Sequence, residues 1–154
     1  MNTRYLTDVK ILYLIYFPFR KEKVMTKKLE LYKCLKCGNL VEVVLAGDGE
    51  LLCCNEPMEL LQANTTDASD EKHVPVFEHH DDELYVRIGA EPHPMTDEHY
   101  IPFIEVISDD EVYIKRKYLK PDEEPLLKLK GYDKGKLTSK SYCNIHGLWE
   151  SKHD

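Results

Sequence analysis

The stretch ELYVRIGA, residues 83–90, alternates polar and apolar side chains and then reaches a glycine. A period of two residues is typical of a β-strand that buries one face, which here would carry Leu84, Val86 and Ile88. The same mixture of alternation and short apolar runs occurs in LELYKC (29–34), LVEVVLAG (40–47), YIPFIEVI (100–107) and EVYIKRKYL (111–119). The sequence therefore predicts an all-β fold.

Turn-forming segments separate these runs at short intervals. They are rich in Gly, Pro, Asp and His, and no segment between them keeps a helical period for three turns. Short strands at this spacing favour a β-sandwich. The segments are GDGE (47–50), HHDDE (79–83), EPHPM (91–95), KPDEEP (120–125) and GYDKG (131–135).

The composition is that of an ordinary globular protein with an acidic body. The chain has 154 residues, of which 42% are hydrophobic and 32% are charged. Residues 1–28 contain seven basic and two acidic side chains, whereas the rest contains 14 basic and 26 acidic ones, a net charge of −12. Such a body would repel phosphate, so we expect no nucleic-acid partner.

The N-terminal segment differs from the rest, and we expect residues 1–26 to lie outside the fold. Its apolar run, within VKILYLIYFPFRKEK (9–23), precedes a basic stretch, and no Ala-x-Ala site follows. A signal peptide has the opposite order of charge and apolar run. We favour Met25 as the true initiator, with a short interfacial anchor as the alternative, and we expect no stable membrane insertion.

A polar stretch without apolar period, QANTTDASDEKH (62–73), predicts the boundary between two domains. The first would span residues 27–62 and the second residues 63–154. A unit of about 35 residues buries too little apolar surface to fold alone and normally needs a metal or disulfides.

Four of the five cysteines lie in that first domain, in two pairs: Cys34 with Cys37, and Cys53 with Cys54. Two pairs of thiolates at this separation suit one tetrahedral metal, either a structural zinc or iron. The adjacent pair must bend the chain locally for both sulfurs to reach one ion. We expect a cytoplasmic protein with reduced thiols rather than a disulfide framework.

The second domain contains a separate group of candidate ligands. Each alone is typical of a loop histidine or a buried cysteine, but together they offer four imidazoles and one thiolate. Such a set suits a redox metal better than a structural zinc, and five ligands leave one octahedral position open. His79, His80 and His153 flank an acidic turn or the terminus and are left out. The candidates are His73, His93, His99, Cys143 and His146.

Five motifs, in this order and spacing, resemble those of the desulfoferrodoxin family, the two-iron superoxide reductases. The resemblance covers residues from about 27 to about 149, although the loops of residues 115–140 do not align clearly. The motifs are YKCLKCGN (32–39), LLCCN (51–55), EKHVP (71–75), HPMTDEHY (93–100) and YCNIHGLW (142–149).

The resemblance implies a small desulforedoxin-like domain followed by an immunoglobulin-like β-sandwich. The four paired cysteines would bind a rubredoxin-like iron, and the four histidines with Cys143 would bind the catalytic iron. Lys72 would lie over the open iron position and attract the superoxide anion, and Glu71 would close onto ferric iron as a sixth ligand. The family also implies hydrogen peroxide as product, an electron donor such as rubredoxin, and a homodimer.

Two other functions remain open on the residues alone. One is a non-catalytic iron electron carrier or metal-storage protein, and the other is a zinc-stabilised binding module. Neither needs a cation beside His73, which is where Lys72 stands. Tyr100, Pro94, Ile145 and Trp149 read as packing residues around the ligands, whereas Asn144 is placed to shape hydrogen bonds to the cysteine sulfur.

Overall fold

The computed structural model describes residues 25–67, 72–91, 93–131 and 135–154. The regular secondary structure of these residues consists of β-strands, so the all-β prediction is confirmed. The chain forms two compact units that divide between Leu60 and Leu61. Of the segment 1–26 that is predicted to lie outside the fold, residues 1–24 lie outside the described residues. Within the described part of the chain, no helix is long and apolar enough to cross a membrane.

The first unit is built from short strands in two small sheets. The central strand β1 pairs antiparallel with β2 on one side and with β5 on the other, and β3 pairs with β4. Met25 forms a bridge to Asp48, and the buried Thr26 donates its hydroxyl to the Gly47 carbonyl, so both residues belong to this unit. The strands are β1 (Leu31–Lys33), β2 (Leu40–Glu42), β3 (Leu52–Cys53), β4 (Glu56–Pro57) and β5 (Glu59–Leu60).

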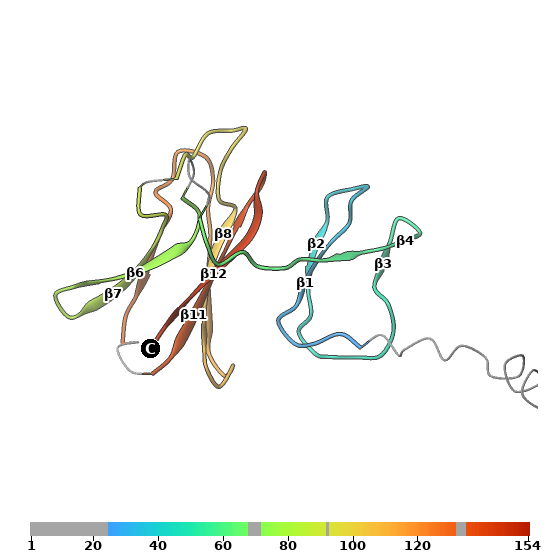
Figure 1. Cartoon of the computed structure of the whole chain (residues 1–154), viewed down its shortest axis with the longest axis horizontal. Helices are drawn as coiled ribbons and strands as arrows, with labels where there is room; N and C mark the ends of the chain where they lie inside the picture. Colours follow the sequence, from blue (N-terminus) through green and yellow to red (C-terminus); the bar gives the residue numbers. More distant parts are fainter. Residues whose placement is uncertain (1–24, 68–71, 92, 132–134) are drawn as a thin grey trace, which may run out of the picture. The chain divides into compact units, whose positions relative to one another are not determined.

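The second unit contains seven described strands in two antiparallel sheets (Figure 1). One sheet has the order β10-β7-β6 and the other has the order β12-β11-β8-β9. The strands are β6 (Pro75–His80), β7 (Glu83–Ile88), β8 (Phe103–Ser108), β9 (Ile114–Tyr118), β10 (Leu126–Leu129), β11 (Leu137–Cys143) and β12 (Gly147–His153).

The core lies between these two sheets, as in a β-sandwich. Strand β7 alternates as its sequence predicts, because Leu84, Val86 and Ile88 are buried while the residues between them are half-buried. They pack with Ile104 and Val106 of β8 in one apolar cluster. At about 25 cal/mol per Å2 of buried apolar surface, such a cluster supplies most of the stabilisation of a sandwich of this size.

The pairing register brings five strand ends to one end of the sandwich. Pro75, the first residue of β6, pairs with Ile88, the last of β7. On the other sheet, Phe103 at the start of β8 pairs with Tyr142 near the end of β11, and Cys143 pairs with Gly147 at the start of β12. The connections at this end carry all five candidate ligands of the second unit.

Candidate metal centres

Two turns present the four cysteines of the first unit. Cys34 follows β1, and the chain then turns so that the Gly38 amide donates to the Cys34 carbonyl at 2.9 Å. Cys53 ends β3, and the next residue, Cys54, adopts a left-handed backbone with φ of 53°. This turn lets two neighbouring side chains point to the same place, which is the local bend that the sequence requires of an adjacent pair.

The sulfur positions fit one tetrahedral metal. All four ligand atoms lie within 4.8 Å of one another. The sulfurs of Cys37 and Cys53 are 3.6 Å apart, and those of Cys53 and Cys54 are 3.9 Å apart. Four sulfurs bound at about 2.3 Å to one ion at the corners of a tetrahedron lie about 3.8 Å from one another. The cluster therefore has the dimensions of a four-thiolate metal site, and its cysteines are not disulfide-bonded.

The thiols of this cluster affect one another's ionisation. The backbone amide of Cys37 stabilises the thiolate of Cys34 and lowers its pKa to about 7. The neighbouring thiol of Cys37 acts in the opposite direction on the other pair, raising the pKa of Cys54 to about 12 and also raising the pKa of Cys53. A bound cation relieves this crowding of negative charge, so metal binding and deprotonation are coupled here.

The second centre collects ligands from three connections. His73 lies two residues before the start of β6, His93 and His99 lie between β7 and β8, and Cys143 and His146 lie at the β11–β12 turn. Their burial is unequal: His73, His93 and Cys143 are buried, whereas His99 is half-buried and His146 is exposed.

The four imidazoles form a closed ring. Successive ring centroids are 4.7 Å apart for His73–His93, 4.5 Å for His93–His99, 4.9 Å for His99–His146 and 4.7 Å for His146–His73. Each of these neighbouring pairs is close to perpendicular, with interplanar angles of 69° to 80°. The diagonal pair His73–His99 is longer, at 6.0 Å. This is the arrangement of four ligands around a common centre.

Atom-level distances identify the nitrogens that face this centre. His146 Nδ1 lies 2.9 Å from His73 Nε2 and 3.5 Å from the Cys143 sulfur. Two nitrogens bound at about 2.1 Å to one ion and at right angles lie about 3.0 Å apart. His99 Nε2 is buried and has no hydrogen-bond partner among the described residues, as a metal-facing nitrogen would. The ligand atoms of His73, His99, Cys143 and His146 all lie within 4.8 Å of one another.

His93 contacts the rings of His73 and His99, although it is not among the four residues whose ligand atoms all lie within 4.8 Å of one another. Its Nδ1 donates to the Pro94 carbonyl, which fixes the tautomer with the lone pair on Nε2. A backbone acceptor on one ring nitrogen is the usual way that proteins orient a metal-binding histidine.

Two neighbouring residues, Trp149 and Asn144, support the ligands through contacts that the sequence pattern does not show. The indole of Trp149 stacks on the His73 ring at 4.7 Å and 15°, so its role exceeds general packing. Asn144 bridges two ligand segments, accepting from the Tyr100 amide at 2.9 Å and donating to the Glu98 carbonyl at 2.8 Å. Its Oδ1 is 4.0 Å from the Cys143 sulfur, so these two backbone bonds, and not one to sulfur, are its main contacts.

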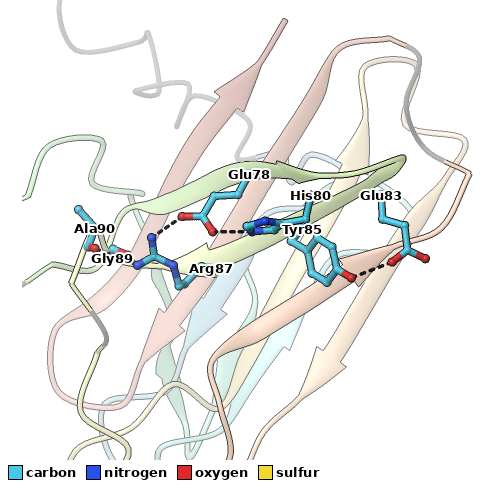
Figure 2. Close-up of polar contacts among 7 residues, drawn as sticks. All are labelled: Glu78, His80, Glu83, Tyr85, Arg87, Gly89 and Ala90. Atoms are coloured by element: carbon cyan, nitrogen blue, oxygen red, sulfur yellow. Dashed lines mark hydrogen bonds and ion pairs between the residues drawn. The ribbon is translucent and has the colours of Figure 1, made fainter.

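Lys72 is described and half-buried, whereas Glu71 lies outside the described residues. Gly89 packs against Lys72: a Cβ added at Gly89 would lie 2.4 Å from the Lys72 carbonyl oxygen. The Gly89 turn is fixed in turn by Arg87, which donates to the Gly89 and Ala90 carbonyls and pairs with Glu78 (Figure 2). The contacts of Arg87 thus hold the Gly89 turn, against which Lys72 packs.

Comparisons with known proteins cover both units. The profile of the Desulfoferrodoxin N-terminal domain matches residues 26–61, and the Desulfoferrodoxin profile matches residues 65–152. A desulfoferrodoxin homolog of Archaeoglobus fulgidus is 49% identical over 127 residues, which are 82% of this chain and 99% of the homolog.

Two further similarities are to proteins named superoxide reductase. The protein of Pyrococcus abyssi is 38% identical over 102 residues, covering 56% of this chain and 89% of its own. The crystal structure of the superoxide reductase from Treponema pallidum matches with a TM-score of 0.60 and 25% identity, covering 82% of this chain and 99% of that one.

Proposed function

The chain belongs to the desulfoferrodoxin family, and from that premise we propose that it is a superoxide reductase, which reduces superoxide by one electron to hydrogen peroxide. The observation that carries this function is the ring of four imidazoles beside one buried thiol. Iron held by these residues would supply the one electron in passing from ferrous to ferric, and superoxide would take up two protons as it becomes hydrogen peroxide.

The ligand set leaves one position for the substrate. Iron would be held by the imidazoles of His73, His93, His99 and His146, with the Cys143 thiolate as the fifth ligand. Cys143 is fully buried whereas His146 is exposed, so the sulfur lies on the interior side of the ligand group and the His146 imidazole on its solvent side. The Cys143 thiolate would donate electron density to a bound iron, as a thiolate ligand does in haem proteins.

Lys72 provides the positive charge that an anionic substrate needs. The chain has a net charge of −7, so its overall field opposes the approach of superoxide. This long-range repulsion is screened beyond about 8–10 Å at physiological salt, so a local cation dominates the last part of the approach. The ammonium of Lys72, adjacent to His73, attracts superoxide and stabilises negative charge on the reduced product.

Further elements of the proposal follow from the family resemblance. By that resemblance, Glu71 would be a further ligand of the oxidised iron. The cysteines 34, 37, 53 and 54 hold a second, rubredoxin-like iron, and the sulfur spacing supports that site. An external donor such as rubredoxin restores the ferrous state. The protein acts as a cytoplasmic homodimer.

Anaerobically purified, full-length protein tests this function. It should contain two irons per chain, react with superoxide in pulse radiolysis and yield hydrogen peroxide without dioxygen. His99→Ala should abolish the fast reaction while keeping the rubredoxin-like absorbance of the four-cysteine centre. Release of dioxygen would indicate dismutation, and colourless protein with zinc in both centres would indicate a binding module; either result contradicts the proposal.

A further inference from the structure

One carboxylate oxygen binds the backbone of the ligand His73. Oδ1 of Asp67 accepts from the His73 amide at 2.6 Å and from the Val74 amide at 2.9 Å. Hydrogen bonds to an ionised carboxylate are shorter and stronger than neutral ones, and a single oxygen has lone pairs for both donors. Asp67 therefore fixes two successive peptide units, one of them belonging to a ligand.

The sheet does not fix His73. Strand β6 begins at Pro75, and beyond that pairing the backbone bond from the Gly89 amide to the Val74 carbonyl, 3.1 Å long, extends the ladder by one residue. His73 lies past this point, and two side chains bind its backbone. Asp67 binds its amide, and the buried Ser141 hydroxyl donates to its carbonyl at 3.1 Å.

The other buried ligands are held differently. Cys143 is the last residue of β11 and pairs with Gly147 in the strand register, so the sheet itself places its sulfur. The ring of His93 is oriented by its own neighbour, the Pro94 carbonyl. His73 is thus a buried ligand whose backbone amide is held by a side-chain carboxylate, at a position that precedes the strand pairing of β6.

We propose that Asp67 is a positioning residue of the histidine centre. Its carboxylate holds the His73 backbone so that Nε2 already faces the metal position, with the ring supported by the stacked Trp149. Iron then binds without first ordering this ligand, and the ordering entropy does not weaken its affinity. The identity of the metal as iron rests on the proposed function. The two hydrogen bonds from the His73 and Val74 amides to Asp67 do not depend on that function.

The test compares three variants of the full-length protein. Asp67→Ala removes the oxygen that accepts both hydrogen bonds, Asp67→Asn keeps an oxygen in the same place, and Asp110→Ala is the matched control. Asp110 also accepts a backbone amide, from Val112 at 3.1 Å, but in the β8–β9 turn, away from the ligands. The four-cysteine centre of the same chain serves as an internal reference for iron loading.

The measurement is competition for ferrous iron between the protein and a chelator under anaerobic conditions. Loss of a residue that orients a metal ligand typically weakens metal binding by about 10- to 100-fold. We expect that loss of iron affinity at the histidine centre in Asp67→Ala. In Asp67→Asn, where a weaker neutral acceptor remains, the affinity should recover to within about threefold of wild type. Asp110→Ala should leave the affinity unchanged. The four-cysteine iron should be unaffected throughout.

A folded Asp67→Ala protein with wild-type iron affinity would overturn the inference, as would a loss of affinity that Asp67→Asn does not recover. If Asp67→Ala fails to fold, hydrogen exchange of the wild-type protein provides the test. Slow exchange of the His73 and Val74 amides would support their hydrogen bonds to Asp67, and rapid exchange would reject them. Wild-type protein that binds iron tightly but does not reduce superoxide would refute the proposed function while leaving the role of Asp67 intact.

Discussion

Replacing Gly89 by alanine should destabilise the second unit and displace Lys72. Gly89 has a φ of 79°, in the left-handed region that residues with a Cβ adopt at a cost. An added Cβ would lie 2.4 Å from the Lys72 carbonyl oxygen, 2.6 Å from the Glu91 carbonyl oxygen and 2.8 Å from the Lys72 Cβ. Two of these three atoms are backbone, so the methyl group forces the chain itself to move.

The expected magnitude has two parts. A non-glycine residue in the left-handed region costs about 1–2 kcal/mol. Inserting a methyl group into a packed site costs about 1–3 kcal/mol more. The Gly89→Ala change should therefore lower the free energy of unfolding by about 2–5 kcal/mol. Gly131→Ala separates the two parts, because Gly131 has a φ of 73° but nothing within 4 Å of an added Cβ.

Urea denaturation followed by tryptophan fluorescence measures the difference. Trp149 is the single tryptophan of the chain and lies in the second unit, so its signal reports that unit. Gly131→Ala should lose only about 1–2 kcal/mol. In Gly89→Ala the reaction with superoxide should also slow, since Lys72 moves. Equal losses in the two variants, with an unchanged reaction rate, would refute the close packing of Gly89 against Lys72.

Three further predictions concern the centre and its surroundings. Lys72→Ala should slow the reaction with superoxide about fivefold, because opposite charges about 4 Å apart in water attract by about 1 kcal/mol. The salt dependence of that rate, measured by pulse radiolysis, should also become flatter. Lys72→Arg should keep the wild-type rate and salt dependence, and an unchanged rate in Lys72→Ala would exclude electrostatic steering. Cys143→Ser should remove the thiolate-to-iron absorption band, whose persistence would contradict the fifth ligand. Arg87 lowers the pKa of Glu78, so the pair stabilises the fold above the ordinary glutamate pKa of about 4.3, and this contribution disappears as pH falls through the lowered pKa. Glu78→Gln should therefore be less stable than wild type at neutral pH, and the two stabilities should converge in acid. A stability difference that stays constant at all pH values would argue against the pair.

The sequence predicts strands well where one face is apolar and the other polar. Strand β7 is such a case, with Leu84, Val86 and Ile88 inward. Strand β11 was not predicted, because Ser139 and Ser141 occupy its buried face and obscure the period. Their hydroxyls donate to the Glu105 and His73 carbonyls, which makes burial tolerable. That satisfaction depends on partners 34 and 68 residues away, which a local pattern cannot contain.

The candidate site divides in a similar way. Ligands are recognisable from the sequence because thiolates and imidazoles occur at characteristic spacings, and the resemblance extends to Lys72 and Glu71. The sequence marks Asn144 and Trp149 as neighbours of the ligands but does not predict their contacts, and it does not mark Asp67 at all, because these roles come from hydrogen bonds and stacking across the fold. The aspartate lies in a polar stretch that reads as a linker, and only the bonds to His73 and Val74 distinguish it from its neighbours.

Anomalous diffraction at the iron edge, from crystals of anaerobically purified protein, tests the two-centre account most directly. We expect two iron peaks per chain, one among the paired cysteines and one bonded to the Cys143 sulfur, His146 Nδ1 and the Nε2 atoms of the other three histidines. A second unit without iron, or an iron there that leaves Cys143 or any of the four imidazoles unbound, would contradict it.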